Sequence, residues 1–378
     1  MILLSSIILN LLLLILSQNV KGFEDETLIR KNRAVKVHQK GKWHFPIDYF
    51  VENLPLEVVH KAFNRITGNT CIQFNLQNYL QWKREGIVFE KGPVSRSHLG
   101  KSIRNRLQRV NITEECGKST GCVLHYFGVA FGISPINNRH DRNKHIKVIR
   151  SNLLKERKHA FPRRRKVLFN YYDVGYDYGS LFHDPFNKFS KNGRVTLQPP
   201  LKYYQDMMGQ RLDMAFSDLK LLAMHYCQQH MRKDIKCEND GYVCPKMKNK
   251  CKCPNGYEGR LCTDLTPSNS TCGSTELNAT KIIQELNFNG QISCTIRVKA
   301  EEGSKIAVTV NEMETEKKLP CINKMGLEVK YRKKKDVMGL CLCGKYRNIE
   351  LKSHDNNVLI QYTGKSEKDK VKISFRKI

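Results

Sequence analysis

The stretch that most constrains the fold is residues 121–142, which reads GCVLHYFGVAFGISPINNRHDR. Its first half is almost wholly apolar, and His125 is the only imidazole there. A helix at a protein surface carries a polar stripe along one side. Here one face of the expected helix reads Tyr126, Val129 and Ile133 instead. The pattern therefore predicts a helix that is buried in the core of a domain.

The same residues resemble the active-site segment of the astacin family of zinc metalloendopeptidases. The family motif is H-E-x-x-H-x-x-G-x-x-H, in which three His bind the metal. His125 stands at the first ligand position and Gly132 at the Gly of the motif. Further along, Arg139, Asp141 and Arg142 keep the family spacing. The resemblance implies the family fold around this helix.

Three positions of the motif carry residues with different chemistry. Tyr126 stands at the catalytic Glu position, Val129 at the second His and Pro135 at the third. Catalytic zinc needs about three protein ligands and an open position for water. Val has no lone pair, and the nitrogen of Pro is part of an amide. A Tyr hydroxyl with a pKa of about 10 does not replace the carboxylate that activates metal-bound water.

His125 is the sole family ligand that remains, and two interpretations of it stay open. It is a remaining metal ligand or, as is more common for a single His on an apolar helix, a hydrogen-bonded core residue. The 12 His of the chain include no pair three or four residues apart, the spacing that puts two rings on one helix face. No cofactor is therefore predicted, and zinc is expected only if the chain is an active peptidase.

A second segment, residues 176–184, resembles the family's Y-D-Y-G-S motif and the Met-turn that follows it. Here Phe182 replaces the Met beneath the zinc. Asp184 replaces the Tyr that stabilises the oxyanion, and Ile136 replaces a Glu that receives the mature N-terminus. We therefore predict no catalytic residue in this chain.

The resemblance extends to elements around the motif. A first strand is expected at residues 43–49 and another strand at residues 70–74. An amphipathic helix is expected at residues 56–66, with an apolar face made of Val59, Ala62, Phe63 and Ile66.

The chain has 14 Cys, which in a secreted protein indicate disulfides. The family resemblance implies a bridge between Cys71 and Cys227. A second family bridge has no counterpart, because no Cys lies between Cys71 and Cys116. Cys122 is an additional Cys, and a Cys116–Cys122 bridge at the start of the helix is the expected replacement.

Residues 237–262 resemble an EGF-like module, because they end in the pattern C-x-C-P-x-G-x-x-G-x-x-C. Cys253 and Cys262 belong to this pattern, and both are expected to form disulfides. Five Cys are present where six are usual.

Residues 272–378 resemble a CUB domain, a β-sandwich. Cys272 and Cys294 match its first bridge. Cys321 is expected to pair with Cys341 or Cys343, and the Cys left over is expected to join the odd one of the EGF-like module. Alternating patterns predict half-buried strands at residues 306–310, 349–353, 358–362 and 371–375.

These parts predict an α+β chain with three domains. Residues 34–230 form an astacin-like, metzincin-like domain of two lobes around the former active-site helix. A small disulfide-rich EGF-like module follows at residues 231–264, and an all-β CUB-like sandwich at residues 272–378. This order resembles the multidomain astacins of nematodes. Residues 1–22 are interpreted as a signal peptide, and residues 23–33 as a short pro-segment or, alternatively, as a disordered terminus.

The leader and the Cys content predict a secreted, extracellular protein. Sequons at Asn111, Asn269 and Asn278 agree with that route. The apolar run of the leader is short for a membrane span of about 20 residues, so no membrane span is expected. Nucleic acid is not an expected partner outside the cell, and no oligomeric state is predicted.

The charge is strongly basic, with 65 Lys plus Arg against 36 Asp plus Glu and a formal net charge of +29. Polyanions are the natural partners of such a chain. Basic residues concentrate at residues 144–166 and 330–335, which we interpret as candidate surfaces for sulfated glycans. The alternative for the first stretch is a solvated loop.

The function predicted from the sequence is that of a secreted, catalytically inactive homologue of a metallopeptidase. Such a protein acts by binding an extracellular protein or a polyanionic, sulfated glycan. One alternative is a zinc-dependent metalloendopeptidase with residual or rebuilt activity. Another is a basic adhesion module that glycans hold without any role for the cleft.

Overall fold

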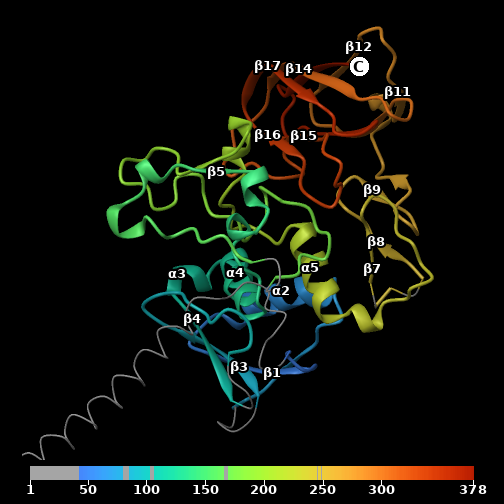
Figure 1. The fold of residues 1–378 in the computed structure, drawn as a ribbon. Coiled ribbons are helices and arrows are strands. Elements are labelled where there is room, and N and C mark those ends of the chain that lie inside the picture. Colours follow the sequence, from blue (N-terminus) through green and yellow to red (C-terminus); the bar gives the residue numbers. More distant parts are fainter. Residues whose placement is uncertain (1–41, 80–84, 103–105, 166–168, 245, 248) are drawn as a thin grey trace, which may run out of the picture.

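The computed structural model describes residues 42–79, 85–102, 106–165, 169–244, 246–247 and 249–378. The predicted signal peptide, the predicted pro-segment and Lys166 lie outside the described residues. Figure 1 shows helices and a sheet from the first half of the chain, a smaller segment beside them and a β-sandwich above. In the described part of the chain, no helix is long and apolar enough to cross a membrane.

The first lobe is a four-stranded parallel sheet that packs against two helices. The strand order is β2–β1–β3–β4. Phe127 of the central helix contacts Phe63 and Phe89, with ring centroids 5.0 and 5.8 Å apart. The central helix therefore lies in the core, as its apolar pattern predicts. The elements are β1 (Ile47–Glu52), α2 (Leu56–Thr67), β2 (Phe74–Leu76), β3 (Gly86–Lys91), β4 (Leu107–Ile112), α3 (Glu114–Gly117) and the central α4 (Thr120–Ala130).

The helix predicted at residues 56–66 is confirmed as α2, and all four residues of its predicted apolar face are buried. The strand predicted at residues 70–74 is wrong for most of its length, because β2 begins only at Phe74. The buried Thr70 hydroxyl donates to the Ile66 carbonyl at 2.9 Å and accepts from the Ile72 N–H at 3.1 Å. These bonds hold the chain in a turn as it leaves α2.

Both ends of α4 are fixed by local chemistry. The Ser119 hydroxyl accepts a hydrogen bond from the Cys122 N–H at 3.2 Å and caps the first turn. The helix ends before Gly132, whose φ of 92° lies in the left-handed region that glycine tolerates. A Cβ at Gly121 would lie 2.0 Å from the Arg211 carbonyl oxygen, so the helix start packs directly against the second lobe.

The second lobe contains little regular structure. Its main helix is α5 (Phe216–Tyr226), most of which is buried, and the Cys71–Cys227 disulfide ties the residue after α5 to the first lobe. The rest is a two-stranded sheet of β5 (Lys147–Val148) and β6 (Leu197–Gln198) with short 3-10 turns. The turns are η2 (Ile136–Asn138), η3 (Arg142–Lys144), η4 (Arg150–Asn152), η5 (Lys155–Arg157), η7 (Lys202–Asp206) and η8 (Gln228–His230).

A small segment of two hairpins follows. In the hairpins, β7 (Tyr242–Val243) pairs with β8 (Cys251–Lys252), and β9 (Tyr257–Glu258) pairs with β10 (Asp264–Leu265). Disulfides join Cys237 to Cys251 and Cys253 to Cys262. A segment this small has little apolar core, so its bridges carry much of its stability.

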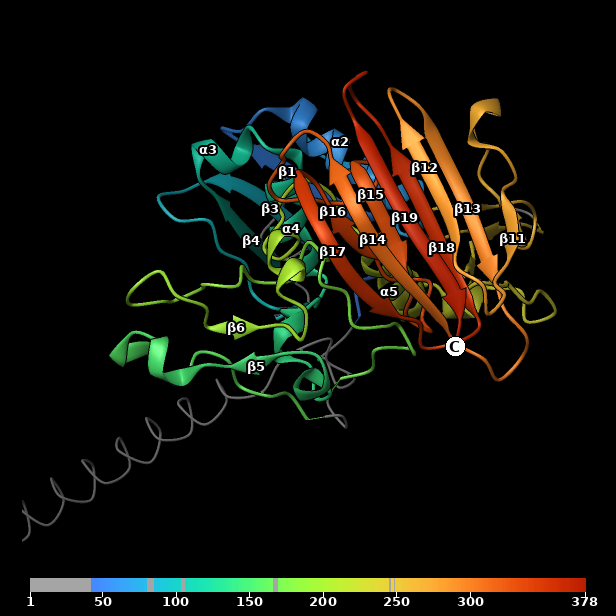
Figure 2. The ribbon, with the colours of Figure 1, turned by 90° about the horizontal axis from the view of Figure 1, so that it is seen from above.

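The C-terminal part is a β-sandwich, whose strands Figure 2 shows from above. One sheet has the order β11–β13–β18–β15–β16 and the other the order β12–β19–β14–β17. All four strands predicted from alternation are present, as β14, β17, β18 and β19. The elements are η9 (Ser270–Cys272), β11 (Glu276–Asn278), β12 (Gln284–Asn289), β13 (Ser293–Lys299), β14 (Ile306–Glu314), β15 (Gly326–Lys330), β16 (Leu340–Leu342), β17 (Lys345–Lys352), β18 (Asn357–Thr363) and β19 (Lys370–Lys377).

The pairing predicted for the two odd Cys is wrong. Cys321 pairs with Cys343, and both Cys244 and Cys341 are buried free thiols. Cys244 packs in a cluster with Ala223 of α5. Cys341 lies in the middle of β16, in the main core. The two thiols belong to separate hydrophobic clusters, and for that reason they do not meet.

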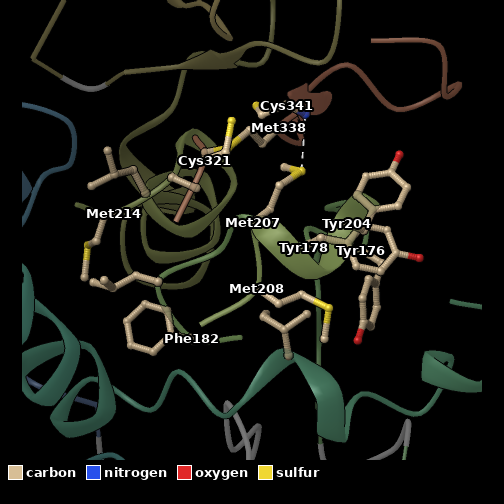
Figure 3. Close-up of a cluster of buried hydrophobic side chains, with 14 of the residues drawn as sticks. Tyr176, Tyr178, Phe182, Tyr204, Met207, Met208, Met214, Cys321, Met338 and Cys341 are labelled. Carbon is tan, nitrogen blue, oxygen red and sulfur yellow. Dashed lines mark hydrogen bonds between the residues drawn. The ribbon is translucent and has the colours of Figure 1, made fainter. Parts of the chain in front are cut away.

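The sandwich is joined to the second lobe through the connection between β15 and β16, residues 331–339. Asp336 is fully buried and forms an ion pair with Lys220 of α5 at 2.7 Å. The Met338 N–H donates to the Asp177 carboxylate at 3.1 Å. In Figure 3, Met338 and Cys341 of the sandwich lie beside Met207 of the second lobe, and Met207 Sδ accepts from the Cys341 N–H at 3.3 Å. The two parts therefore share one core.

The basic surface predicted at residues 330–335 is wrong for most of these residues. Lys330 and Lys335 are only 4% and 3% exposed. Lys330 Nζ donates to the Lys335 and Val337 carbonyls at 3.1 and 2.7 Å. This stretch builds the junction between the two parts, and its buried amines serve as donors there. Within the stretch, Lys333 alone is exposed.

Candidate functional site

The site that the sequence singled out lies on α4, at the contact between the two lobes. His125 Nδ1 lies 3.1 Å from the Leu181 carbonyl oxygen. Because a carbonyl only accepts, Nδ1 carries the proton and Nε2 is left with the lone pair. The imidazole stacks on the Phe182 ring with centroids 5.3 Å apart and an angle of 22° between planes. This arrangement is that of a hydrogen-bonded core histidine.

The surroundings of His125 disfavour a positive charge on it. Burial lowers the pKa of His125 to about 3, and the nearby Arg211 adds to this effect. The ring is therefore neutral over the physiological range, with one nitrogen available to a metal. A single neutral imidazole is a weak site on its own, because zinc in proteins takes three or four protein ligands.

Tyr126, at the position of the family's catalytic Glu, is half-buried beside His125. Burial raises its pKa above the ordinary value, so the hydroxyl stays protonated at neutral pH. It lines a pocket of about 540 Å³ together with Pro93, Val94 and the Cys116–Cys122 bridge. A neutral phenol in this place can donate a hydrogen bond to a ligand and cannot act as a carboxylate base.

The side chains at the two other ligand positions have no atom that could bind a metal. Val129 is half-buried, and its carbonyl oxygen accepts from the Gly100 and Gly132 N–H groups at 2.8 and 2.9 Å. Pro135 precedes η2, and the next residue, Ile136, donates its N–H to the Phe182 carbonyl at 3.0 Å. This bond ties the turn to the segment that carries Phe182 and helps to hold the apolar surroundings together.

Phe182, at the position of the family's Met-turn methionine, stacks on the His125 ring. Its side chain is 1% exposed and packs against α4 at Gly128. A Cβ at Gly128 would lie 2.2 Å from the tip of the Phe182 ring. The glycine is therefore needed for the ring to fit, and the two residues form one packed unit. Figure 3 shows Phe182 within the apolar cluster that also contains Met208 and Met214.

Asp184, at the position of the family's oxyanion-stabilising Tyr, faces Arg211. Their closest charged atoms are 4.0 Å apart. Arg211 also donates to the carbonyls of His183 and Gln210 at 3.1 and 2.7 Å. The Asp184 N–H donates to the Asn137 side chain at 3.1 Å. No role for Arg211 is predicted from the sequence, because contacts between distant segments leave no pattern there.

These residues do not fit a zinc ion. His125 supplies one nitrogen, Val129 and Pro135 supply none, and Phe182 packs on the imidazole ring. Among the described residues, no group of three or more His, Cys, Asp or Glu is arranged so that it could hold a metal.

The remaining predicted site residues lie on other elements. The structure contains the Cys71–Cys227 and Cys116–Cys122 bridges, and also Cys253–Cys262 and Cys272–Cys294. Among the sequon residues, Asn269 and Asn278 are exposed. Asn111 is half-buried in β4, and its amide donates to the Glu90 carboxylate at 2.8 Å. Asn111 is therefore the least accessible of the three for a glycan.

The fold and the site define a class of protein: a two-lobed peptidase-like domain docked onto a CUB-type sandwich. Residues 32–227 match the Astacin peptidase family, and residues 272–376 match the CUB domain. The first match covers more than half of the chain, so the chain belongs to the astacin family. The predicted fold class, with its mixed α and β structure and its sandwich, is confirmed.

Individual relatives agree with this assignment. The chain is 29% identical over 341 residues to "Zinc metalloproteinase nas-34" of Caenorhabditis elegans, covering 89% of this chain and 56% of that protein. It is 26% identical over 320 residues to "Blastula protease 10" of Paracentrotus lividus, covering 80% and 53%. The chain thus spans about half the length of the curated relatives it matches. Among solved structures, high choriolytic enzyme 1 of Oryzias latipes aligns with a TM-score of 0.42 at 22% identity, covering 48% of this chain and 88% of that one.

Proposed function

We propose that this astacin-family protein is secreted, does not cleave peptides and acts by binding an extracellular protein or a polyanionic glycan. The observation that carries the proposal is the packing of His125. The one family ligand that remains is held by the Leu181 carbonyl and covered by Phe182. Apolar residues stand at the two other ligand positions, so the groups that would replace the hydration shell of zinc are missing.

The loss of the general base supports the same proposal. General acid–base catalysis contributes about 10²–10⁴-fold to rates in enzymes. A protonated Tyr126 supplies none of this in the role of a base. Restoring one group is therefore not sufficient, because Tyr126→Glu would create a base without a metal-bound water to activate.

The binding half of the proposal is supported by charge. The formal net charge of +29 favours polyanionic partners, and residues 150, 155, 157, 158, 163 and 165 of the basic stretch are exposed Lys or Arg. We further propose that residues 231–264 are an EGF-like spacer between the two larger domains. The competing function is zinc-dependent proteolysis, which membership of the family favours.

The test is the metal content of the purified secreted chain, together with turnover of a broad peptide library with and without a zinc chelator. We expect well below one zinc per chain and no chelator-sensitive cleavage. The triple variant Tyr126→Glu, Val129→His, Pro135→His is the matched comparison, because it restores all three changed positions of the motif. About one zinc per wild-type chain, with cleavage that the chelator stops, would overturn the proposal.

A further inference from the structure

A second pocket lies at the junction of the peptidase-like domain and the CUB sandwich. Its volume is about 580 Å³, within the range of about 300–1,000 Å³ that is common for small-molecule sites. Its lining includes four buried rings, those of Tyr176, Tyr178, Tyr204 and Tyr331. The residues that His125 contacts through its hydrogen bond and its ring, Leu181, Tyr126 and Phe182, are not among the lining residues of this pocket.

The charge of the lining is mainly positive. Five cationic side chains line the pocket against two carboxylates. Both carboxylates already have cationic partners: Asp141 accepts two hydrogen bonds of 2.9 Å from Arg139, and Asp173 pairs with Lys334. Lys334 has a further partner in Asp240 at 3.1 Å. The acidic groups therefore cannot neutralise the remaining cations.

Three of the cations, Lys144, Arg332 and Lys333, form no ion pair with any described residue. Arg332 is partly buried and held in place by the Tyr176 and Met338 carbonyls at 2.8 and 3.3 Å. Its guanidinium also lies over the Tyr178 ring, 5.2 Å from the centroid. A guanidinium has five N–H donors, so Arg332 has further N–H groups that could bind an anion. The nearby Asp177 carboxylate is among the groups that hold the pKa of Arg332 up against the effect of its burial, although the two form no ion pair. Lys144 and Lys333 form no ion pair with any described residue, so their charges favour an anion nearby.

Two imidazoles also line the pocket, and burial is the main cause that lowers the pKa of each. Burial lowers the pKa of His145 to about 4, and Arg332 is among the cations that lower it further. The pKa of His354 is lowered by burial first and by Arg332 next. Both rings are therefore neutral at pH 7 and are available as hydrogen-bonding groups. The charge of the pocket comes from Lys and Arg and persists over the physiological pH range.

The two basic stretches of the sequence meet at this pocket. Lys144 comes from the stretch at residues 144–166, and Arg332 and Lys333 come from residues 330–335. The sequence suggested two separate surfaces, whereas folding brings the first residue of one stretch and the middle of the other to a single cavity. The pocket therefore depends on the docking of the sandwich onto the second lobe.

We propose that this pocket binds a sulfated sugar residue of an extracellular glycan. Lys and Arg donors suit the oxygens of a sulfate group. A cavity of about 580 Å³ lined by tyrosine rings has room for a saccharide ring beside the anion. The inference rests on the proposed function insofar as the chain acts by binding, and it does not depend on whether zinc is absent.

The test uses the full secreted chain and calorimetric titration with a heparin-derived tetrasaccharide, its fully desulfated form and inorganic sulfate. The test variant is Lys144→Gln with Lys333→Gln, which removes two exposed cations from the pocket. The matched control is Lys191→Gln with Lys352→Gln, two exposed lysines outside the pocket and outside both basic stretches, without an ion pair to any described residue. Both variants lose the same net charge, one Lys from each large domain.

We expect binding of the sulfated tetrasaccharide that is about tenfold weaker in the test variant, and a change of less than about twofold in the control. The desulfated sugar should not bind, and inorganic sulfate should bind more weakly than the tetrasaccharide. Equal losses in both variants would show a general charge effect and overturn the proposal, as would equal binding of sulfate and tetrasaccharide or no binding at all. Zinc content and peptide turnover are read separately, so failure here is distinct from failure of the proposed loss of catalysis.

Discussion

Two regions at the centre of the peptidase-like domain differ in how many hydrogen bonds their buried polar side chains form. Around His125, one side-chain hydrogen bond reaches a carbonyl, and the rest of the contact is with rings and aliphatic groups. Around Asp218, the carboxyl group accepts from the Ser180 hydroxyl at 2.5 Å and from the Leu181 and Ala215 N–H groups at 2.9 and 3.0 Å. The polar groups that hold the backbone are present, and those that would hold a metal are not.

This difference shows that the groups that hold the fold of the domain are distinct from the groups that would bind zinc. Buried N–H groups need partners whether or not the domain carries a metal, and Asp218 satisfies two of them beside the former Met-turn. Zinc ligands are not needed as partners for buried N–H groups. Apolar side chains that fill the space can therefore replace them. The region around Asp218 should therefore carry stability, and the region around His125 should tolerate change.

The largest expected effect tests whether the two lobes need their covalent tie. Replacing Cys71 and Cys227 by Ser opens a bridge with a sequence separation of 156, for which the chain-entropy account gives a loss of about 5 kcal/mol. The matched control replaces Cys116 and Cys122, with a separation of 6, and should lose about half as much. Denaturant unfolding measures both. A larger loss from the short bridge would mean that the region beside Tyr126 carries the stability.

The next effect concerns Asp218. Asp218→Ala leaves the Ser180 hydroxyl and two buried N–H groups without an acceptor, and each such group costs about 1–3 kcal/mol. A loss of about 3 kcal/mol or more in the free energy of unfolding is expected. Asp218→Asn keeps one acceptor oxygen and should lose less. A loss below about 1 kcal/mol for the Ala variant would contradict the contrast between the two regions.

Much of this fold follows from sequence pattern. The 3.6-residue period located α2, and alternation located β14, β17, β18 and β19. The residue types at Tyr126, Val129 and Pro135 predict that these positions supply no metal ligand, because ligand chemistry is a property of residue type. Residues 70–74 were misjudged because the Thr70 hydroxyl bonds to α2 and competes with strand pairing.

What the sequence could not supply depends on docking between distant segments. Lys330 and Lys335 read as surface charges and are buried, because their amines reach carbonyls at the domain junction. The pocket at Arg332 and Lys333 exists only once the sandwich contacts the second lobe. Likewise, whether Cys321 pairs with Cys341 or Cys343 depends on how β16 is packed in the core.

A smaller effect concerns pH. The pKa of His125 is lowered to about 3 in the folded chain, against about 6.5 when unfolded. The neutral ring therefore contributes stability that is complete above about pH 6.5 and is lost as the pH falls toward 3, because the unfolded chain binds the extra proton. His125→Gln should reduce this slope by up to about 1.4 kcal/mol per pH unit. The free energy of unfolding of both proteins, measured between pH 6.5 and 4.5, gives the difference. The contributions of the other buried histidines are the same in both proteins and cancel.

The smallest effect concerns the Tyr126 hydroxyl, which has no hydrogen-bond partner among the residues that the structure describes. Its ring packs edge-on against His125, with centroids 5.2 Å apart, and Tyr126→Phe keeps that contact. We expect a change in unfolding free energy within about 0.5 kcal/mol. Binding of the sulfated tetrasaccharide should not change, because Tyr126 lies in a different pocket.

A Tyr126→Phe variant that loses zinc or peptide turnover present in the wild type would show that the region around His125 still performs chemistry. The contrast with Asp218 would then fail at the position where the family has its catalytic Glu.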